Sequence, residues 1–384
     1  MTSMRKMRRL VVAGLVMAGA LTACTTGADS GARQPLSDAG RADLQRALDA
    51  AVGAGTPGVQ VVVTEQGKEW TATSGVGDIA TGAGFPAAAR IRIGSNTKAF
   101  VATVMMQLVA AGTVDLDAPI ERYLPGVVQG DGIDGNRITV RNLMQHTSGL
   151  PEYLELPELD GDYAAMLKQH FDSAALVRSA LSTMPAHFPP GEKAEYSNTN
   201  YLIVGMLVER LTGKPFAEEI THRIIEPLGL KATYIPAPGE IELRDPHPLG
   251  YEIVDGQRTD LTRLETSWAG SAGAMVSTGS EVNRFFTALL TGKLVQPAQL
   301  AEMQRDPKPL TNREGIDYGL GLARLSVPCG KQVWGHGGSI PGFRTYDGVT
   351  ADGRAVTVLA NLRASDAATA AAQQHVFDTA ICAA

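Results

Sequence analysis

The sequence predicts an α/β (α+β) fold: one antiparallel sheet formed from both chain ends, flanked by helices, with an inserted all-helical region. Two observations support this expectation. Short β-branched runs separated by turn residues occur at 59–73 and return only after residue 317. Between them, residues 151–290 show mostly helical patterns interrupted by Pro and Gly. The two ends therefore supply the strands, and the middle supplies the helices.

The N-terminal part supplies a helix, a hairpin and a buried central helix. Asp38–Ala51 has a helical pattern, and the runs Val59–Val63 and Trp70–Thr73 flank a glycine turn, as in a hairpin. From Ala99 to Ala111 no residue is charged and only two are polar. We therefore expect a helix that is buried on all sides and stops at Gly112.

The rest of the chain supplies loops, further helices and the later strands. Residues 115–130 and 136–150 are expected to form loops and short helical pieces, and Leu202–Leu211 an apolar-periodic helix. Near the C-terminus, short runs between turn residues predict strands, and an Ala-rich segment predicts a last helix. The runs are Tyr318–Arg324, Gln332–Trp334, Phe343–Val349 and Ala355–Ala360, and the helix is Asp366–Ile381.

Composition excludes several function classes. The chain has 384 residues, 44% hydrophobic and 19% charged, which is enough apolar material for a large core. The net charge of -6 is spread out, with no basic run beyond the N-terminus, so we expect no nucleic-acid partner. Neither an H-E-x-x-H motif, a Cys/His cluster nor a G-x-x-x-x-G-K loop occurs, so we expect no metal and no other cofactor. The absence of G-x-S-x-G disfavours an α/β-hydrolase.

Residues 1–24 have the pattern of a signal peptide. Four basic residues precede an apolar stretch, Leu10 to Leu21, that is too short for a good transmembrane span. The sequence Leu21-Thr-Ala-Cys24 resembles the bacterial lipobox, which implies lipidation of Cys24 and an extracytoplasmic, membrane-anchored lipoprotein. A secreted or periplasmic protein is the alternative. Residues 25–37 should be a flexible tether. The domain 38–384 should follow, with its sheet part at about 38–112 and 310–384 and its helical part at about 113–309.

Export also bears on the other two cysteines. With Cys24 lipidated, Cys329 and Cys382 form an even pair in an oxidising compartment, which favours a disulfide. Two buried free thiols are the alternative. A bridge would close a loop of roughly fifty residues and stabilise the fold by roughly 4 kcal/mol.

A serine and a lysine lie three residues apart where the central helix begins, in Ser95-Asn-Thr-Lys98. Residues at this spacing share one helix face, so Lys98 would lie one turn from Ser95 at the edge of an apolar core. Burial disfavours the charged amine and lowers its pKa, which would let Lys98 accept the proton that a nucleophilic Ser95 loses. The alternative is an N-capping serine and a lysine that extends to solvent.

A second motif, Tyr196-Ser-Asn198, precedes the helix at 202–211. Ser197, Asn198 and Thr199 are natural N-caps, so the motif could simply begin that helix. In the catalytic interpretation, Tyr196 lies near Lys98. A positive neighbour would lower the pKa of the phenol and let it transfer a proton.

A third motif, His336-Gly337-Gly338-Ser339, is rich in glycine and lies between two expected strands. Glycines at this density let the backbone approach a ligand closely, and the N–H of Ser339 could complete an oxyanion hole with that of Ser95. A glycine-rich hairpin turn with a surface histidine is the alternative.

In this order and at these separations, the three motifs resemble the serine β-lactamase and penicillin-binding protein family, with its β-lactamase/transpeptidase-like fold. The closest branches are the Streptomyces-type soluble D-alanyl-D-alanine carboxypeptidases and the class C β-lactamases. The resemblance covers nearly the whole mature chain. It includes Gln145-His146-Thr-Ser-Gly149-Leu150, Ser267-Trp268-Ala-Gly-Ser-Ala-Gly273, Tyr318-Gly-Leu-Gly-Leu322, and Cys329 with its partner near the C-terminus.

The resemblance implies that Ser95 is the acylated nucleophile and that Lys98 and Tyr196 share the general acid and base work. Asn198 would hold the substrate amide, and the N–H groups of Ser95 and Ser339 would bind the oxyanion. His336 would act as a proton shuttle or electrostatic partner near Tyr196. The remaining expected substrate-site residues are Gly337, Gly338 and Trp268.

The implied function is that of a serine hydrolase, first of all a D-alanyl-D-alanine carboxypeptidase-like, penicillin-binding enzyme of the bacterial cell envelope. Its substrate would be a peptidoglycan-derived peptide, a β-lactam or a small ester, and the protein would be a monomer. An esterase or class C-like β-lactamase on the same fold is the alternative. A non-catalytic penicillin-binding lipoprotein is the third interpretation.

Two positions depart from the carboxypeptidase pattern, which has a hydroxyl residue after the histidine and an arginine after the Gly-Leu-Gly-Leu run. Here these positions are Gly337 and Ala323. Loss of a guanidinium removes a bidentate, charge-assisted contact to a C-terminal carboxylate. The sequence therefore predicts weak discrimination between a free carboxylate and its amide, unless Arg324, Arg344 or Ser339 compensates.

Overall fold

The computed structural model describes residues 36–159 and 167–383. The signal peptide, the lipobox Cys24 and most of the expected tether lie outside these residues. Eleven helices are described: α1 (Asp38–Gly53), α2 (Thr97–Ala110), α3 (Val140–Met144), α5 (Ser173–Thr183), α6 (Asn198–Thr212), α7 (Phe216–Ile220), α8 (Glu226–Leu228), α9 (Gly270–Gly273), α10 (Gly279–Leu290), α11 (Pro297–Gln304) and α12 (Ala367–Cys382).

Strands and short turns of helix complete the described elements. The single-turn elements are η1 (Gly94–Asn96), η2 (Ile120–Arg122), η3 (Tyr153–Glu155) and η4 (Thr221–Ile225). The strands are β1 (Gly58–Glu65), β2 (Lys68–Gly75), β3 (Ile91–Arg92), β4 (Gln129–Gly130), β5 (Ile133–Asp134), β6 (Tyr251–Val254), β7 (Gln257–Asp260), β8 (Val276–Ser277), β9 (Lys308–Pro309), β10 (Ile316–Tyr318), β11 (Ala323–Leu325), β12 (Val333–Ile340), β13 (Phe343–Thr350) and β14 (Ala355–Ala360).

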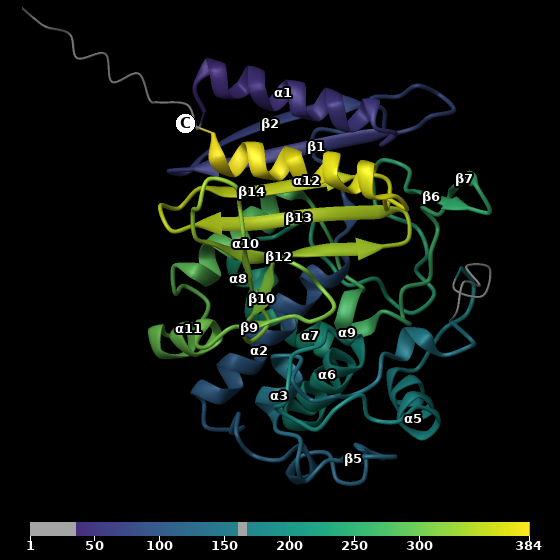
Figure 1. Cartoon of the computed structure of the whole chain (residues 1–384), viewed down its shortest axis with the longest axis vertical. Coiled ribbons are helices and arrows are strands. Elements are labelled where there is room, and N and C mark those ends of the chain that lie inside the picture. Colours follow the sequence, from purple (N-terminus) through teal and green to yellow (C-terminus); the bar gives the residue numbers. More distant parts are fainter. Residues whose placement is uncertain (1–35, 160–166, 384) are drawn as a thin grey trace, which may run out of the picture. The chain divides into compact units, whose positions relative to one another are not determined.

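One antiparallel sheet of eight strands joins the two ends of the chain. Its order is β2-β1-β14-β13-β12-β11-β10-β9, so the N-terminal hairpin pairs with the C-terminal strands between β1 and β14. Figure 1 shows the purple and yellow ends of the chain side by side in this sheet. The predicted antiparallel sheet built from both ends is confirmed.

Helices cover both faces of the sheet. Helices α1 and α12 pack side by side on one face, and α10 packs on the other, against β1, β13 and β14. Alternate residues of β1 point to the two layers: Val61 and Val63 contact the α1/α12 side, whereas Val62 lies against Gly279 of α10. Because both faces are buried, β1 has three consecutive valines, Val61 to Val63, rather than an alternation of apolar and polar residues.

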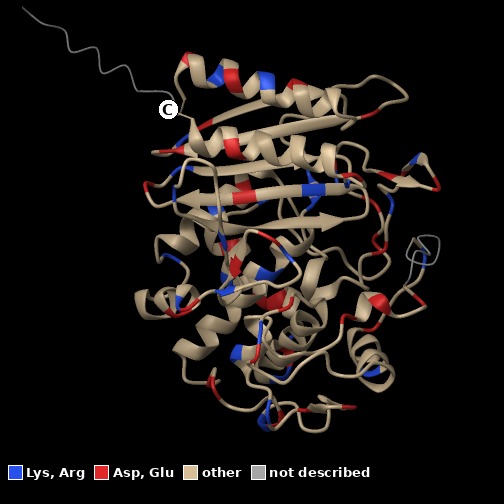
Figure 2. Ribbon diagram, in the orientation of Figure 1, with Lys and Arg blue, Asp and Glu red and all other residues tan. Residues whose placement is uncertain are grey.

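The inserted region between β3 and β9 is mostly helical and contains the central helix. Eleven of the fourteen residues of α2 are buried, from Thr97 to Leu108, as the uncharged run that follows Lys98 predicts. The region also contains the hairpin β6–β7, which the helical pattern did not predict. Acidic and basic residues are interspersed over the described helices, strands and loops (Figure 2).

Two strand predictions near the C-terminus were wrong in their bounds. Tyr318–Arg324 is not one run, because the chain turns between β10 and β11 at Gly321, which has φ +73°. β12 does not end at Trp334 but continues to Ile340, through the glycines that we expected to form a loop. Glycine has little strand propensity, so its density concealed a strand that pairs with β13 along its whole length.

The structure contains the predicted disulfide, at the end of the C-terminal helix. Cys329 and Cys382, the last residue of α12, form the predicted bridge, with their Cα atoms 5.7 Å apart. The alternative of two free thiols is therefore wrong.

Within residues 36–159 and 167–383, no helix has the length and hydropathy that crossing a membrane requires.

Candidate active site

Ser95 lies on η1, a single turn held tightly between α2 and β12. Two glycines allow this close approach. Gly94 has φ +50°, and a Cβ atom there would come within 2.9 Å of the Ser339 nitrogen. A Cβ atom on Gly338 would lie 2.0 Å from the carbonyl oxygen of Ile93. Any side chain at either position would push the nucleophile away from the strand.

The second residue of the motif, Asn96, fixes η1 to the sheet. Its buried Nδ2 donates to Thr345 Oγ1 and to Asp347 Oδ2 on β13, each at 2.7 Å. Asp347 is buried, and burial raises the pKa of its carboxyl group to about 7. The backbone that carries Ser95 is thus held by a polar network inside the core rather than by surface contacts.

Lys98 is buried beside Ser95, with an exposed fraction of 0%. Its Nζ lies 3.2 Å from Ser95 Oγ, 2.7 Å from Asn198 Oδ1 and 2.7 Å from the carbonyl oxygen of Ala272. The alternative of a solvent-directed lysine is therefore wrong. Burial holds the pKa of Lys98 well below its ordinary value, and Glu152 offsets this only in part. A neutral amine at this distance can accept the Ser95 proton.

The phenol of Tyr196 lies close to Lys98 and to Arg313. Lys98 Nζ is 4.9 Å from the centroid of its ring, and the Arg313 guanidinium is 5.1 Å from the same centroid. The sequence predicted a lowered pKa for Tyr196, and this prediction was wrong. Burial raises the pKa of the phenol, and the nearby Ser95 hydroxyl and Arg313 only partly offset it. Tyr196 is therefore a proton donor in the free protein.

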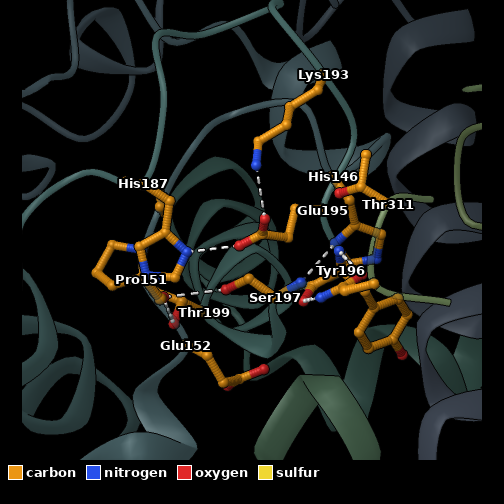
Figure 3. Close-up of polar contacts among 12 residues, drawn as sticks. His146, Pro151, Glu152, His187, Lys193, Glu195, Tyr196, Ser197, Thr199 and Thr311 are labelled. Atoms are coloured by element: carbon orange, nitrogen blue, oxygen red, sulfur yellow. Dashed lines mark hydrogen bonds and ion pairs between the residues drawn. The ribbon is translucent and has the colours of Figure 1, made fainter.

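His146 holds the segment that carries Tyr196. Its backbone oxygen accepts from the N–H of Glu195 at 2.9 Å, and its Nδ1 accepts from the N–H of Ser197 at 3.3 Å. The two rings, His146 and Tyr196, are 4.2 Å apart between centroids. Figure 3 shows His146 against this segment, with Glu195 bound to His187 and Lys193 on the other side. The sequence singled out His146 only as part of a matching stretch.

His336 lies on β12 and is paired with a tyrosine other than the expected one. Its Nε2 is 2.8 Å from the hydroxyl of Tyr318, whereas its ring centroid is 6.5 Å from that of Tyr196. Burial lowers the pKa of His336 to about 3, and the charge of Lys98 adds to this effect. The imidazole is therefore neutral at ordinary pH. The expected role of His336 as a shuttle stays a prediction.

The free edge of β12 offers backbone donors to a ligand. The strand pairs with β11 only up to Gly335, so residues 336–340 have no strand partner on that side among the described residues. The two-residue turn Pro341-Gly342 makes Ile340 and Phe343 the first bonded pair of the hairpin, and bonded pairs alternate along it. The N–H of Ser339 therefore points to the free edge, beside Ser95, as an oxyanion hole requires.

These groups line a cavity of about 440 Å³. Its walls include Ser95, Tyr196, His336, Gly337 and Ser339. Asn198 lies behind them against Lys98, and Gly338 packs on η1. Trp268 is 6% exposed, belongs to the core and does not line the cavity. A contact between Trp268 and substrate stays a prediction.

Two arginines line this cavity, and one of them, Arg344, was among the residues expected to compensate for Gly337 and Ala323. Arg324 forms an ion pair with Asp317 at 2.6 Å and is not among the lining residues. Arg313 and Arg344 both line the cavity, and neither forms an ion pair with an acidic residue of the described ranges. The cavity wall thus carries two guanidinium groups that remain available to an anionic ligand.

Sequence and structure comparisons place this geometry in a family. The family model described as Beta-lactamase matches residues 44–380. The chain belongs to the β-lactamase family. The D-stereospecific amidohydrolase from Streptomyces sp. shares its fold, with a TM-score of 0.81 at 36% identity over 89% of this chain and 98% of that chain. The family is one of serine hydrolases, as the motifs predict.

For two curated relatives of this β-lactamase-family chain, the match covers a smaller share of the relative's own length. "Penicillin-binding protein 4*" of Bacillus subtilis is 28% identical over 66% of this chain and 56% of the relative. "D-aminopeptidase" of Cereibacter sphaeroides is 28% identical over 84% of this chain and 60% of the relative. The chain thus spans a little more than half the length of each. No cluster of three metal-ligating side chains is found among the residues described.

Proposed function

We propose that this chain is a D-stereospecific serine amidohydrolase, which cleaves the amide bond that follows a D-residue through an acyl-enzyme on Ser95. The contact of the buried Lys98 amine with the Ser95 hydroxyl carries this proposal, because it supplies an activated nucleophile. The names of two relatives, a D-stereospecific amidohydrolase and a D-aminopeptidase, support an amide bond and the D-configuration.

The geometry supports a specific order of proton transfers. Neutral Lys98 accepts the proton of Ser95 as its Oγ attacks the carbonyl carbon. The resulting oxyanion lies between the N–H groups of Ser95 and Ser339. Tyr196, which is still protonated, gives its proton to the leaving nitrogen and recovers one from the Lys98 ammonium. The amine then leaves, and a water molecule attacks the acyl-enzyme with the same groups in the reverse roles.

Peptidoglycan-derived D-alanyl-D-alanine peptides are the proposed natural substrates, as for the carboxypeptidase-like enzyme that the motifs predict. Extracytoplasmic attachment through Cys24 would place the enzyme beside this material, and it belongs to the same proposal. We further propose that the protein acts as a monomer. Esters and β-lactams remain test substrates, because the same nucleophile can attack their carbonyl groups.

Paired substrates of opposite configuration test the proposal. D-phenylalanine amide, its L-enantiomer, D-alanyl-D-alanine, a nitrophenyl ester and a chromogenic cephalosporin would be compared on the purified protein, with Ser95→Ala as control. We expect hydrolysis of the D-amide and the D-peptide, little of the L-amide, and none by the variant. Cleavage of the ester or the cephalosporin alone would refute the amidohydrolase, and activity in Ser95→Ala would refute the mechanism.

A further inference from the structure

One carboxylate near the nucleophile has no assigned role. Glu152 precedes η3 on the loop after the Gln145–Leu150 stretch, and its side chain is only partly exposed. Its Oε2 accepts from the backbone N–H of Asn198 at 2.9 Å and from Asn198 Nδ2 at 2.8 Å. Its Oε1 accepts from the N–H of Leu154 at 3.2 Å. The carboxylate is thus held on three donors immediately behind the catalytic groups.

The side chain of Asn198 connects this carboxylate to Lys98. Asn198 Oδ1 accepts from Lys98 Nζ at 2.7 Å, and Nδ2 donates to Glu152. An ionised carboxylate can only accept hydrogen bonds, so it fixes which end of the amide faces it. The oxygen must then face Lys98. One Nδ2 hydrogen is used by Glu152, and the second is left for the carbonyl oxygen of a bound substrate.

We propose that Glu152 is a positioning residue, which fixes the orientation of Asn198 and balances the charge that Lys98 acquires when it takes the Ser95 proton. The three acceptors that Lys98 Nζ contacts directly are neutral: Ser95 Oγ, Asn198 Oδ1 and the Ala272 carbonyl. Glu152 is the acidic group that interacts electrostatically with Lys98, and Arg313 acts in the opposite direction. An ammonium formed in this core therefore depends on Glu152 for compensation.

Glu152 also has a structural contact that the test must separate from this role. It caps α6, because its Oε2 takes the first free N–H of that helix. Ser197, one of the three expected caps, makes no such contact and instead donates its hydroxyl to the oxygen of Pro151. Loss of a cap lowers stability without altering proton transfer, so a purely structural Glu152 predicts a stability change alone.

Titration of Lys98 separates the two roles and needs no substrate. The Lys98 resonance of ¹³C-lysine-labelled protein would be followed against pH in wild type, Glu152→Gln and the matched control Glu155→Gln, with Lys98→Met for assignment. Glu155 is the exposed acidic residue at the end of the same turn. Five other ionisable groups interact electrostatically with Lys98 or Glu152. They are Arg313, Tyr153, Tyr196, His146 and His336.

We expect Glu152→Gln to lower the pKa of Lys98, because the ammonium loses its counter-charge, while Glu155→Gln leaves it unchanged. An unchanged pKa in Glu152→Gln would overturn the inference. The kinetic readouts rest on the proposed function. There, Glu152→Gln should lower kcat/KM at least about tenfold and move the acid limb of the pH profile to lower pH.

Folding and function controls keep the outcomes distinct. Thermal unfolding identifies a variant that fails to fold, and Glu152→Asp then keeps the charge while shortening its reach. The pKa of Lys98 should fall less in Glu152→Asp than in Glu152→Gln, because Asp keeps the negative charge. An equal fall in both variants would contradict charge compensation. If wild type hydrolyses none of the D-substrates but the Lys98 titration shifts as expected, the proposed function fails and the role of Glu152 stands.

Discussion

Replacing Arg344 tests whether the protein recognises a carboxylate on its substrate. The sequence alone predicted weak discrimination, since Gly337 and Ala323 replace the expected grip. The structure changes that expectation, because Arg344 lines the cavity with Ser95 and its guanidinium stacks at 4.6 Å on the Tyr346 ring. The positive charge of Arg344 also acts on Tyr196 and on His336, and in each case it favours a lower pKa. We therefore expect preference for a substrate with a free carboxylate.

The magnitude follows from the loss of one charge-assisted hydrogen bond. Such a bond contributes about 1.5 to 3 kcal/mol, which corresponds to about 10- to 150-fold in kcat/KM. Wild type should therefore cleave D-alanyl-D-alanine faster than its C-terminal amide by about this factor, and Arg344→Ala should remove most of the difference.

The assay compares kcat/KM for the two substrates in wild type, Arg344→Ala and the control Arg324→Ala. Arg324 is on β11 of the same sheet, which β12 separates from the β13 strand of Arg344, and it pairs with Asp317 outside the cavity. We expect the control to keep the wild-type preference. Equal rates for the acid and the amide in wild type, or an unchanged preference in Arg344→Ala, would refute the reasoning.

Three further predictions concern the base, a buried imidazole and the disulfide. Lys98→Ala should lower kcat/KM by roughly a hundred- to ten-thousandfold through loss of the base, with KM changed much less; steady-state kinetics that show a loss under tenfold would contradict this role. His336 has its pKa lowered to about 3 in the fold, so below its ordinary value of 6.5 the unfolded chain takes up a proton that the folded chain does not. The free energy of unfolding should therefore fall as pH decreases, by roughly 1.4 kcal/mol per pH unit between about pH 6 and pH 4, and denaturant titrations should find this contribution missing in His336→Gln. Cys329→Ser opens a bridge across a sequence separation of 53 residues and should lower the free energy of unfolding by about 4 kcal/mol, whereas an unchanged denaturant midpoint would show that the bridge adds no stability.

Local sequence pattern was enough to predict the frame of the fold. The uncharged run of α2 and the β-branched runs of β1 and β14 carry their burial in their own residues, so their bounds were close to those observed. The Ser95 and Lys98 contact followed from helix spacing and from the cost of a buried amine. These features depend on neighbours in the sequence.

Features that depend on distant contacts could not be predicted in the same way. The strand through His336 to Ile340 was not predicted because it is rich in glycine. The reason for the glycines is clear only from the structure, in which Gly338 packs closely against η1. Glu152 carries no motif signal, since its meaning comes from Asn198, 46 residues further along the chain. The raised pKa of Tyr196 could be found only from the structure. Burial of the phenol decides its pKa, and the expected positive neighbour, Lys98, is itself buried so that its charge is disfavoured.

The central claim is that Ser95 is a nucleophile activated by Lys98. Its most direct test is mass spectrometry of the protein after incubation with a penicillin and with a D-amino acid ester, followed by peptide mapping. The account predicts one covalent acyl adduct per chain on the peptide that contains Ser95, absent in Ser95→Ala and strongly reduced in Lys98→Ala. An adduct on another residue, or equal labelling of the Lys98→Ala variant, would contradict it.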